Sequence, residues 1–218
     1  MKKRFIIFMM ILVPVLLSGC QNEHFTADNL PWISDASILF KDDFNTQTGG
    51  WETHEDGMSF SRYEEGGFRL NVNVPNYQFW RVPGLNFQDV HVLSNVMKLG
   101  GPDDNLFGLI CRYQNENNFY SLVISSDGYY GIFRKSNGVQ ELVGQEQLGF
   151  SERINRGEDI NQLLAVCHQD RLALFVNGIK LFEANDDSLS YGDVGIIVGN
   201  FSTPGVDVLF ENFVVVKP

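Results

Sequence analysis

The sequence predicts an all-β protein, folded as a two-sheet antiparallel β-sandwich, and three observations support this fold class. Residues 38–216 contain about fourteen short runs in which apolar and polar residues alternate, the period of half-buried strands. Asp-Gly and Asn-Gly pairs separate several of these runs, and both pairs favour tight hairpins. The chain of 218 residues also holds 21 glycines and 18 phenylalanines, which suit turns and strands better than helices.

The amino-terminal segment, residues 1–19, has the composition of a secretory signal peptide. Three basic residues precede the apolar run Phe5–Leu17, and the small residues Ser18 and Gly19 follow it. The apolar run is shorter than the roughly 20 residues that a membrane-spanning helix needs. We therefore expect a cleaved signal, with an uncleaved anchor helix as the alternative.

Residues 20–37 are predicted to form a polar tether, because they lack the alternation of a strand. A flexible tether of about 17 residues would span roughly 20–25 Å. The rest of the chain, residues 38–218, forms the predicted sandwich domain.

The strands and turns of this domain can be placed from local patterns. Apolar residues recur at every second position along 68–74 and 172–176, which predicts strands with one face in the core. Asp127-Gly128, Asn137-Gly138 and Asn177-Gly178 lie between such runs and are predicted to form type I′ hairpin turns, in which both residues have positive φ.

The charge of the chain excludes one class of partner. The net charge is −11, and it would be −14 without the three basic residues of segment 1–19. A body this acidic repels nucleic-acid phosphates and anionic lipid surfaces. We therefore expect no nucleic-acid partner.

Two cysteines in the domain, Cys111 and Cys167, are candidates for a disulfide. An even pair in an exported domain favours a bridge. The alternative is two buried free thiols, which pack as small apolar residues.

Candidate ligand contacts come from aromatic and basic residues on predicted strands. Aromatic rings beside polar groups suit sugars, whose C–H faces are apolar and whose rims carry hydroxyls. Phe79 and Trp80 point to opposite faces of a strand, so one of them faces outward. The full set of predicted contacts is Trp80, Tyr77, Arg112, Tyr120 and Arg134.

No metal or cofactor site is predicted. No pair of the four histidines has zinc-ligand spacing. The loops 101–105 and 186–187 are rich in oxygen ligands, so calcium remains an alternative at either one. Such loops are more often turns, because Asp and Asn hydrogen-bond to their own backbone.

The sequence Leu17-Ser18-Gly19-Cys20 resembles the lipobox of bacterial lipoproteins. The resemblance implies cleavage before Cys20 and a lipid on the Cys20 sulfur. We therefore expect the protein to be lipid-anchored on the extracytoplasmic side of the cell envelope, with the membrane as one partner. The choice between inner and outer membrane stays open.

Three stretches of the domain, 40–51, 107–129 and 172–213, carry a second resemblance. Their motifs include Phe40-Lys-Asp-Asp-Phe44 with Gly50-Trp51, Phe107-Gly-Leu-Ile-Cys-Arg-Tyr113, and Leu172-Ala-Leu-Phe-Val-Asn-Gly178. Together they resemble the concanavalin A-like lectin/glucanase superfamily, above all laminin G-like modules and 3-keto-disaccharide hydrolase-type domains. The resemblance implies a jelly roll with one concave face and with its first and last strands side by side.

The resemblance leaves three functions open. Members of the superfamily that hydrolyse β-glucans carry Glu-x-Asp-x-Glu on one strand, and this chain lacks that motif. We therefore predict a non-catalytic module that binds a glycan or another cell-surface polymer. A glycoside or 3-keto-disaccharide hydrolase, with acid/base chemistry from Glu52, Asp56 or Glu65, is one alternative. A structural or adaptor lipoprotein is the other. The ligand and the oligomeric state are not predicted.

Overall fold

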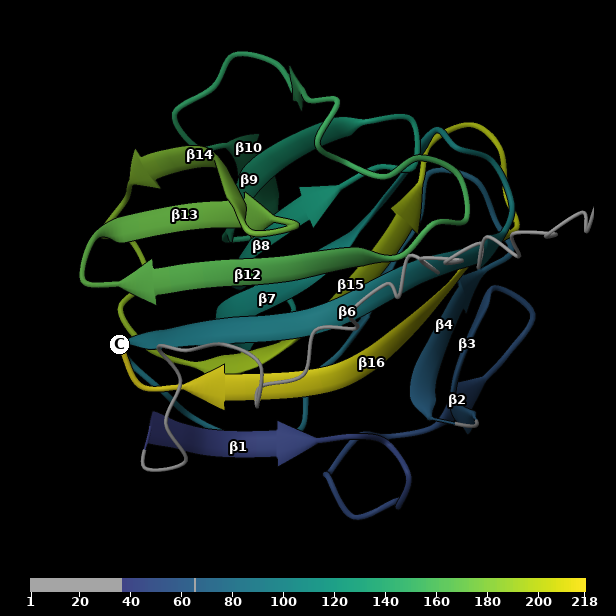
Figure 1. The fold of residues 1–218 in the computed structure, drawn as a ribbon, viewed down its shortest axis with the longest axis horizontal. Helices are drawn as coiled ribbons and strands as arrows, with labels where there is room; N and C mark the ends of the chain where they lie inside the picture. Colours follow the sequence, from purple (N-terminus) through teal and green to yellow (C-terminus); the bar gives the residue numbers. More distant parts are fainter. Residues whose placement is uncertain (1–36, 65) are drawn as a thin grey trace, which may run out of the picture.

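The computed structural model describes residues 37–64 and 66–218, and it is a sandwich of two antiparallel sheets (Figure 1). All the regular elements within the described residues are β-strands, so the predicted all-β class is confirmed. The predicted signal peptide, the tether up to residue 36 and Cys20 lie outside the described residues. Within the described part, no helix is long and apolar enough to cross a membrane.

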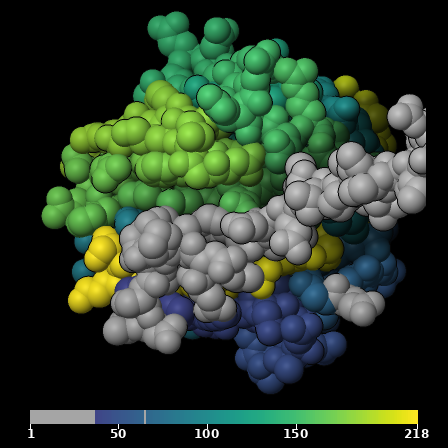
Figure 2. All heavy atoms as spheres, viewed as in Figure 1, coloured from purple at the N-terminus to yellow at the C-terminus, as the bar shows by residue number. Residues whose placement is uncertain are grey.

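Sheet A has nine strands, in the order β14-β13-β12-β6-β16-β4-β3-β2, with β1 beside one half of β16. In space-filling form the strands β12–β14 of this sheet make a continuous packed surface (Figure 2). The strands are β1 (Ile38–Asp42), β2 (His54–Glu55), β3 (Ser59–Glu64), β4 (Gly67–Val72), β6 (Val90–Gly100), β12 (Asn161–His168), β13 (Arg171–Val176), β14 (Ile179–Asn185) and β16 (Val206–Val216).

Sheet B has seven strands, in the order β10-β9-β8-β7-β15-β5, with β11 paired to β9. Its strands are β5 (Gln78–Arg81), β7 (Asn105–Asn115), β8 (Asn118–Ile124), β9 (Tyr129–Ser136), β10 (Val139–Leu142), β11 (Gly149–Phe150) and β15 (Asp193–Asn200).

The first and last strands lie side by side, as the family resemblance implies. Ile38 in β1 is opposite Val216 in β16, and the pair is antiparallel. The first half of β16 pairs with β4 instead. Asn212, with φ of 52°, sits where the register of β16 against β6 shifts, so a bulge separates the two halves of this strand.

The main core lies between the two sheets and follows the predicted alternation. Phe68, Leu70 and Val72 of β4 are fully buried in it. Trp51 is also buried there and packs edge-on against Phe213, with ring centroids 4.9 Å apart. Burying large aromatic rings in this way is a major source of stability in a sandwich.

Two of the three predicted hairpin turns form as expected, and one differs. Both residues of Asn137-Gly138 and of Asn177-Gly178 have positive φ, as type I′ turns require. At Asp127-Gly128 only Gly128 does, so the prediction of a type I′ turn is wrong there. The N–H of Gly128 donates to the carbonyl of Ser125, and the longer turn places positive φ on the glycine alone.

The antiparallel strands of sheet B define two ends of the sandwich. β7 begins, β8 ends and β9 begins at one end, which we call the loop end; the register pairs Phe107 with Ile124 there. At the opposite end, Asp193 at the start of β15 lies opposite Tyr113 in the last part of β7. We call this opposite end the closed end.

Candidate functional site

A disulfide joins the two sheets at the closed end. Cys111 of β7 in sheet B is bonded to Cys167 of β12 in sheet A. Both cysteines are fully buried. The bond therefore ties the two layers together from inside the core.

Arg112, which follows the disulfide cysteine, points into the protein. Its φ of 52° lies in the left-handed region, and the register of β7 against β8 shifts just after Cys111. The side chain is only 2% exposed. Its guanidinium donates to the carbonyl oxygens of Leu189, at 2.9 Å, and Gln169, at 2.6 Å. The bulge breaks the alternation from which the sequence placed Arg112 beside a ligand.

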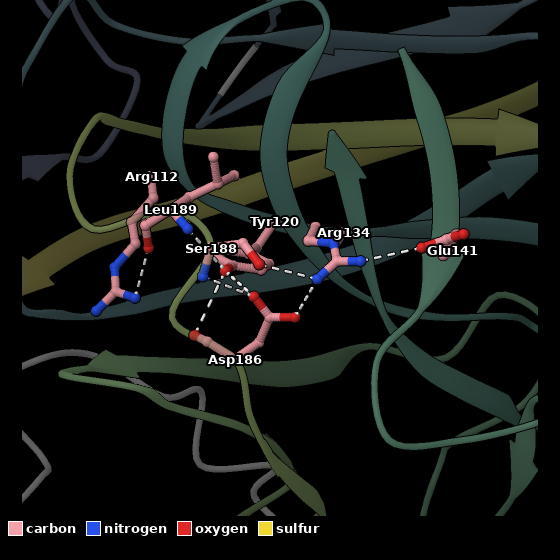
Figure 3. Close-up of polar contacts among 7 residues, drawn as sticks. All are labelled: Arg112, Tyr120, Arg134, Glu141, Asp186, Ser188 and Leu189. Atoms are coloured by element: carbon pink, nitrogen blue, oxygen red, sulfur yellow. Dashed lines mark hydrogen bonds and ion pairs between the residues drawn. The ribbon is translucent and has the colours of Figure 1, made fainter. Parts of the chain in front are cut away.

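Tyr120 and Arg134 converge on one carboxylate, that of Asp186 (Figure 3). The hydroxyl of Tyr120, which is fully buried, donates to Asp186 Oδ1 at 2.5 Å and accepts from the N–H of Leu189 at 3.1 Å. Arg134 donates to Asp186 Oδ2 at 2.6 Å and to Glu141 at 3.0 Å. These contacts hold the 186–189 segment against sheet B.

The pKa values of this network follow from its contacts. Burial opposes ionisation of Asp186, but hydrogen bonds from Tyr120 and Ser188 and the nearby charge of Arg134 outweigh it, so its pKa lies below the ordinary value. Burial and the bond to Asp186 raise the pKa of Tyr120. The network therefore holds a carboxylate and a neutral phenol, and both are engaged within the protein.

Tyr77 also lies apart from the other predicted contacts. It packs against the main core, and its N–H donates to Asn200 Oδ1 at 3.3 Å. The structure therefore does not gather the five predicted contacts into one site. Of the five, Trp80 is the one that packs with the apolar cluster on the outward face of sheet B.

Trp80 belongs to a group that we call the aromatic face. Its ring centroid is 5.3 Å from that of Phe119 in β8. The Nζ of Lys135 in β9 lies 4.9 Å from the Trp80 ring and 5.5 Å from the Phe119 ring, within cation–π range. Burial lowers the pKa of Lys135. The members of the aromatic face are Trp80, Tyr113, Phe119, Phe133 and Lys135.

Sequence reasoning missed every member of this face except Trp80. Alternation offered a signal, because Phe119 has the opposite parity to the core residue Tyr120 and so had to point outward. Tyr113 has no such signal, because it follows the bulge at Arg112.

A retaining glucanase needs two carboxylates on one face of a strand, so the outward positions of sheet B, beginning with β8, matter for catalysis. Those of β8 are Phe119, Ser121 and Val123, because the alternating residues Tyr120 and Leu122 are in the main core. No strand of sheet B, within the described residues, carries two Asp or Glu residues. The paired-carboxylate strand of a retaining glucanase therefore has no counterpart in the described part of this sheet.

Of the acids considered for catalysis in the sequence, Glu52 is exposed and Asp56 has a local role. Asp56 accepts from the N–H groups of Met58 and Ser59, at 2.8 Å each, and so shapes a turn. His54 pairs with the other oxygen of Asp56 at 3.1 Å. Glu65 is outside the described residues.

One aspartate in each of the two loops considered for calcium is paired with a basic side chain. Asp103 of the first loop is paired with Lys98, and Asp186 of the second with Arg134. Within residues 37–64 and 66–218, no group of three or more His, Cys, Asp or Glu side chains is arranged to hold a metal ion.

A large hollow lies at the loop end, and sequence reasoning did not identify it. Its volume is about 810 Å³. Leu148 lines it and also packs against the apolar cluster of the aromatic face, so the two features adjoin. The lining residues are Asp104, Asn105, Ser125, Asp127, Tyr129, Gln147, Leu148, Gly149, Phe150 and Phe201.

Comparison with known proteins identifies the fold. No family model matches the chain, and no curated protein matches it. Among solved structures, a Bacillus subtilis carbohydrate-binding module, CBM66, has a TM-score of 0.59 at 14% identity, covering 83% of this chain and 97% of that one. A Bacillus subtilis protein of unknown function with a galectin-like fold has a TM-score of 0.64 at 12% identity, covering 83% and 96%.

The structure of an enzyme resembles this chain to a similar degree. Bacillus licheniformis β-glucanase has a TM-score of 0.61 at 12% identity, covering 82% of this chain and 98% of the enzyme. These likenesses confirm the predicted concanavalin A-like sandwich. At such identities they show the fold alone, and the same fold serves both binding modules and hydrolases.

Proposed function

We propose that this chain is a non-catalytic glycan-binding module and that the aromatic face of sheet B is its binding surface. One observation carries the proposal: the half-buried Trp80 and Lys135 lie together on the outward side of the sheet, where the buried ring of Phe119 packs against them. The fold shared with a carbohydrate-binding module supports it.

The chemistry of the aromatic face suits a sugar. The Trp80 ring is partly exposed and offers a flat apolar surface to the C–H face of a pyranose ring. The ammonium of Lys135 beside it can donate to ring hydroxyls or to a carboxylate on the sugar. An aromatic platform with one adjacent polar group is a common arrangement for binding small polar ligands.

Hydrolysis remains the second candidate, because two carboxylates, Asp104 and Asp127, line the hollow at the loop end. The β-glucanase that shares the fold gives this candidate a precedent. Release of reducing sugar from a bound polymer would establish it, and loss of that release in Asp104→Asn would assign the acid.

The binding test uses Trp80→Ala in pull-down with insoluble polysaccharides: cellulose, mixed-linkage β-glucan, xylan and chitin. We expect affinity for the bound polymer to fall about tenfold or more, the size of one lost aromatic contact. Tyr191→Ala is the matched control, because Tyr191 is 50% exposed and lies outside this face. Equal binding by wild type and Trp80→Ala, with both folded, would reject the aromatic face as the site.

We also propose that the chain is a lipoprotein of the cell envelope, lipidated at Cys20. The lipobox-like Leu17–Cys20 supports this proposal, and more than one acyl chain would make the anchor stable. Metabolic labelling with a fatty acid should mark the wild type and leave Cys20→Ala unmarked. Equal labelling of both proteins would contradict it.

A further inference from the structure

The hollow at the loop end is built from four segments, three of which are linked to one another by hydrogen bonds. Residues 101–104 follow β6, 125–128 follow β8, 147–150 include β11, and 201–205 follow β15. At about 810 Å³ the hollow lies in the size range of small-molecule sites, roughly 300–1,000 Å³.

A buried asparagine fixes two of these segments. Asn105 is fully buried, and its Nδ2 donates to the carbonyl of Pro102 at 2.6 Å and to Ser126 Oγ at 3.0 Å. The N–H of Ser126 donates back to Asn105 Oδ1 at 3.0 Å. The N–H of Ser151, which directly follows the third segment, donates to the carbonyl of Gly128 and so links the third segment to the second. These three segments are therefore held in place before a ligand binds, which lowers the entropy cost of binding.

Three aromatic side chains at this hollow are exposed. Tyr129, Phe150 and Phe201 are 41%, 48% and 37% exposed. Tyr129 and Phe150 pack edge to face, with ring centroids 5.4 Å apart. Apolar rings gathered around a concavity are a frequent mark of a binding site.

The charged residues of the lining all have one sign. Asp104 and Asp127 line the hollow, and no Lys or Arg does. Asp127 accepts a hydrogen bond from Ser125 Oγ through Oδ1. A basic group also lies beside the rim: the guanidinium carbon of Arg156 is 5.1 Å from the centre of the Phe150 ring. Carboxylates beside exposed rings complement a ligand with an apolar face and a positive charge.

We propose that the hollow is a second sugar subsite, adjoining the aromatic face, and that it takes a hexose carrying a protonated amino group. This proposal rests on the proposed glycan-binding function and adds the class of sugar. The rings of Phe201 and Tyr129 would contact the apolar face of the sugar. Asp104 and Asp127 would accept charge-assisted hydrogen bonds from its ammonium.

The test compares two oligosaccharides with the same backbone, β-1,4-linked glucosamine and its fully N-acetylated form. We expect the wild type to bind the free-amine oligosaccharide about tenfold more tightly, a typical gain for a charge-assisted contact. In Asp104→Asn/Asp127→Asn that preference should fall to about twofold or less, with the same thermal unfolding midpoint as the wild type.

A matched variant separates local contacts from the overall negative charge. Glu55→Gln/Asp187→Asn removes the same number of charges from two exposed residues outside the hollow, and it should keep the full preference. A preference that survives in Asp104→Asn/Asp127→Asn, or that both double variants lose equally, would overturn the proposal. So would equal binding of the two oligosaccharides by the wild type.

A third variant distinguishes failure of this proposal from failure of the proposed function. Trp80→Ala should weaken binding of both oligosaccharides and leave their ratio unchanged. If Trp80→Ala weakens binding while the wild type shows no preference for the amine, the aromatic face stands and the amino-sugar subsite is rejected.

Discussion

The two ends of the sandwich use the same residue types in opposite ways. At the closed end Tyr120 is buried, the side chain of Asp186 is only 10% exposed, and the two are bonded to each other. At the loop end Tyr129 is exposed and Asp104 faces the hollow. A tyrosine and an aspartate thus serve the fold at one end and remain available to a ligand at the other.

The comparison teaches that a binding residue is recognised by its unused bonding capacity. Arg112 and Arg134 were predicted as ligand contacts because a charged residue at mid-strand either faces solvent or lines a polar concavity. Arg112 donates to backbone carbonyls, and both terminal nitrogens of Arg134 donate to carboxylates of the protein itself. Within the described residues, only the buried Nε of Arg134 lacks a partner among the donors of these two side chains. Changes at the closed end should therefore alter stability, and changes at the loop end should alter binding.

The largest effect should come from removing the disulfide. Cys111→Ala/Cys167→Ala frees two positions 56 residues apart and should cost about 2–5 kcal/mol. At roughly 2–4 °C per kcal/mol, calorimetry should show a clear fall in the unfolding midpoint. Wild type unfolded in a thiol reductant should approach the variant. An unchanged unfolding midpoint in the variant would contradict the claim that the closed end stabilises the fold through this disulfide.

A smaller loss should follow from changing the shared carboxylate. Asp186→Asn weakens the acceptors for Tyr120 and Arg134 and should cost roughly 1–3 kcal/mol, the range for hydrogen bonds with a charged partner. Denaturant unfolding measures this loss. Asp187→Asn is the matched control, since Asp187 is the exposed neighbour and its change should fall within about 0.5 kcal/mol. Equal losses in the two variants would contradict the role of Asp186.

The dependence of stability on pH in the acid range should show the contribution of the Asp186 carboxylate. The pKa of Asp186 is lower in the folded protein than its ordinary value of 3.8. Its ionisation therefore stabilises the fold fully above that value, and this contribution is lost as the pH falls through the lower folded pKa. Thermal unfolding of wild type and Asp186→Asn should differ at pH 6, and the difference should shrink as the pH is taken below the ordinary carboxyl pKa of 3.8. A difference that stays constant over this range would count against the assignment.

The smallest effect on stability should come from the loop end. Asp104→Asn changes an exposed side chain and should shift the free energy of unfolding by less than about 0.5 kcal/mol. Denaturant unfolding checks this beside the Asp186→Asn measurement. A loss as large as that of Asp186→Asn would remove the contrast between the two ends.

Much of the fold was predictable because alternation is a local property. It placed Phe68, Leu70 and Val72 in the core, and Asn-Gly pairs located two hairpins. The candidate sites were harder, because they depend on contacts between distant segments. The bulge at Arg112 turned a predicted ligand contact inward.

The loop-end hollow is the clearest case of such long-range assembly. It combines residues from 104 to 201, and the loop containing Phe150 has no periodic signal of its own. Only the pairing of strands shows that these segments meet.

The adjacency of β1 and the end of β16 has a mechanical consequence. β16 starts after the 201–205 segment and finishes at the closed end, so Ile38, opposite Val216, also lies at the closed end. Tension transmitted through residue 37 would enter the domain there and pull along the axis of β1, loading its bonds to β16 in shear. An attachment on that side would leave the opposite pole, with its exposed rings, pointing away from whatever holds the chain.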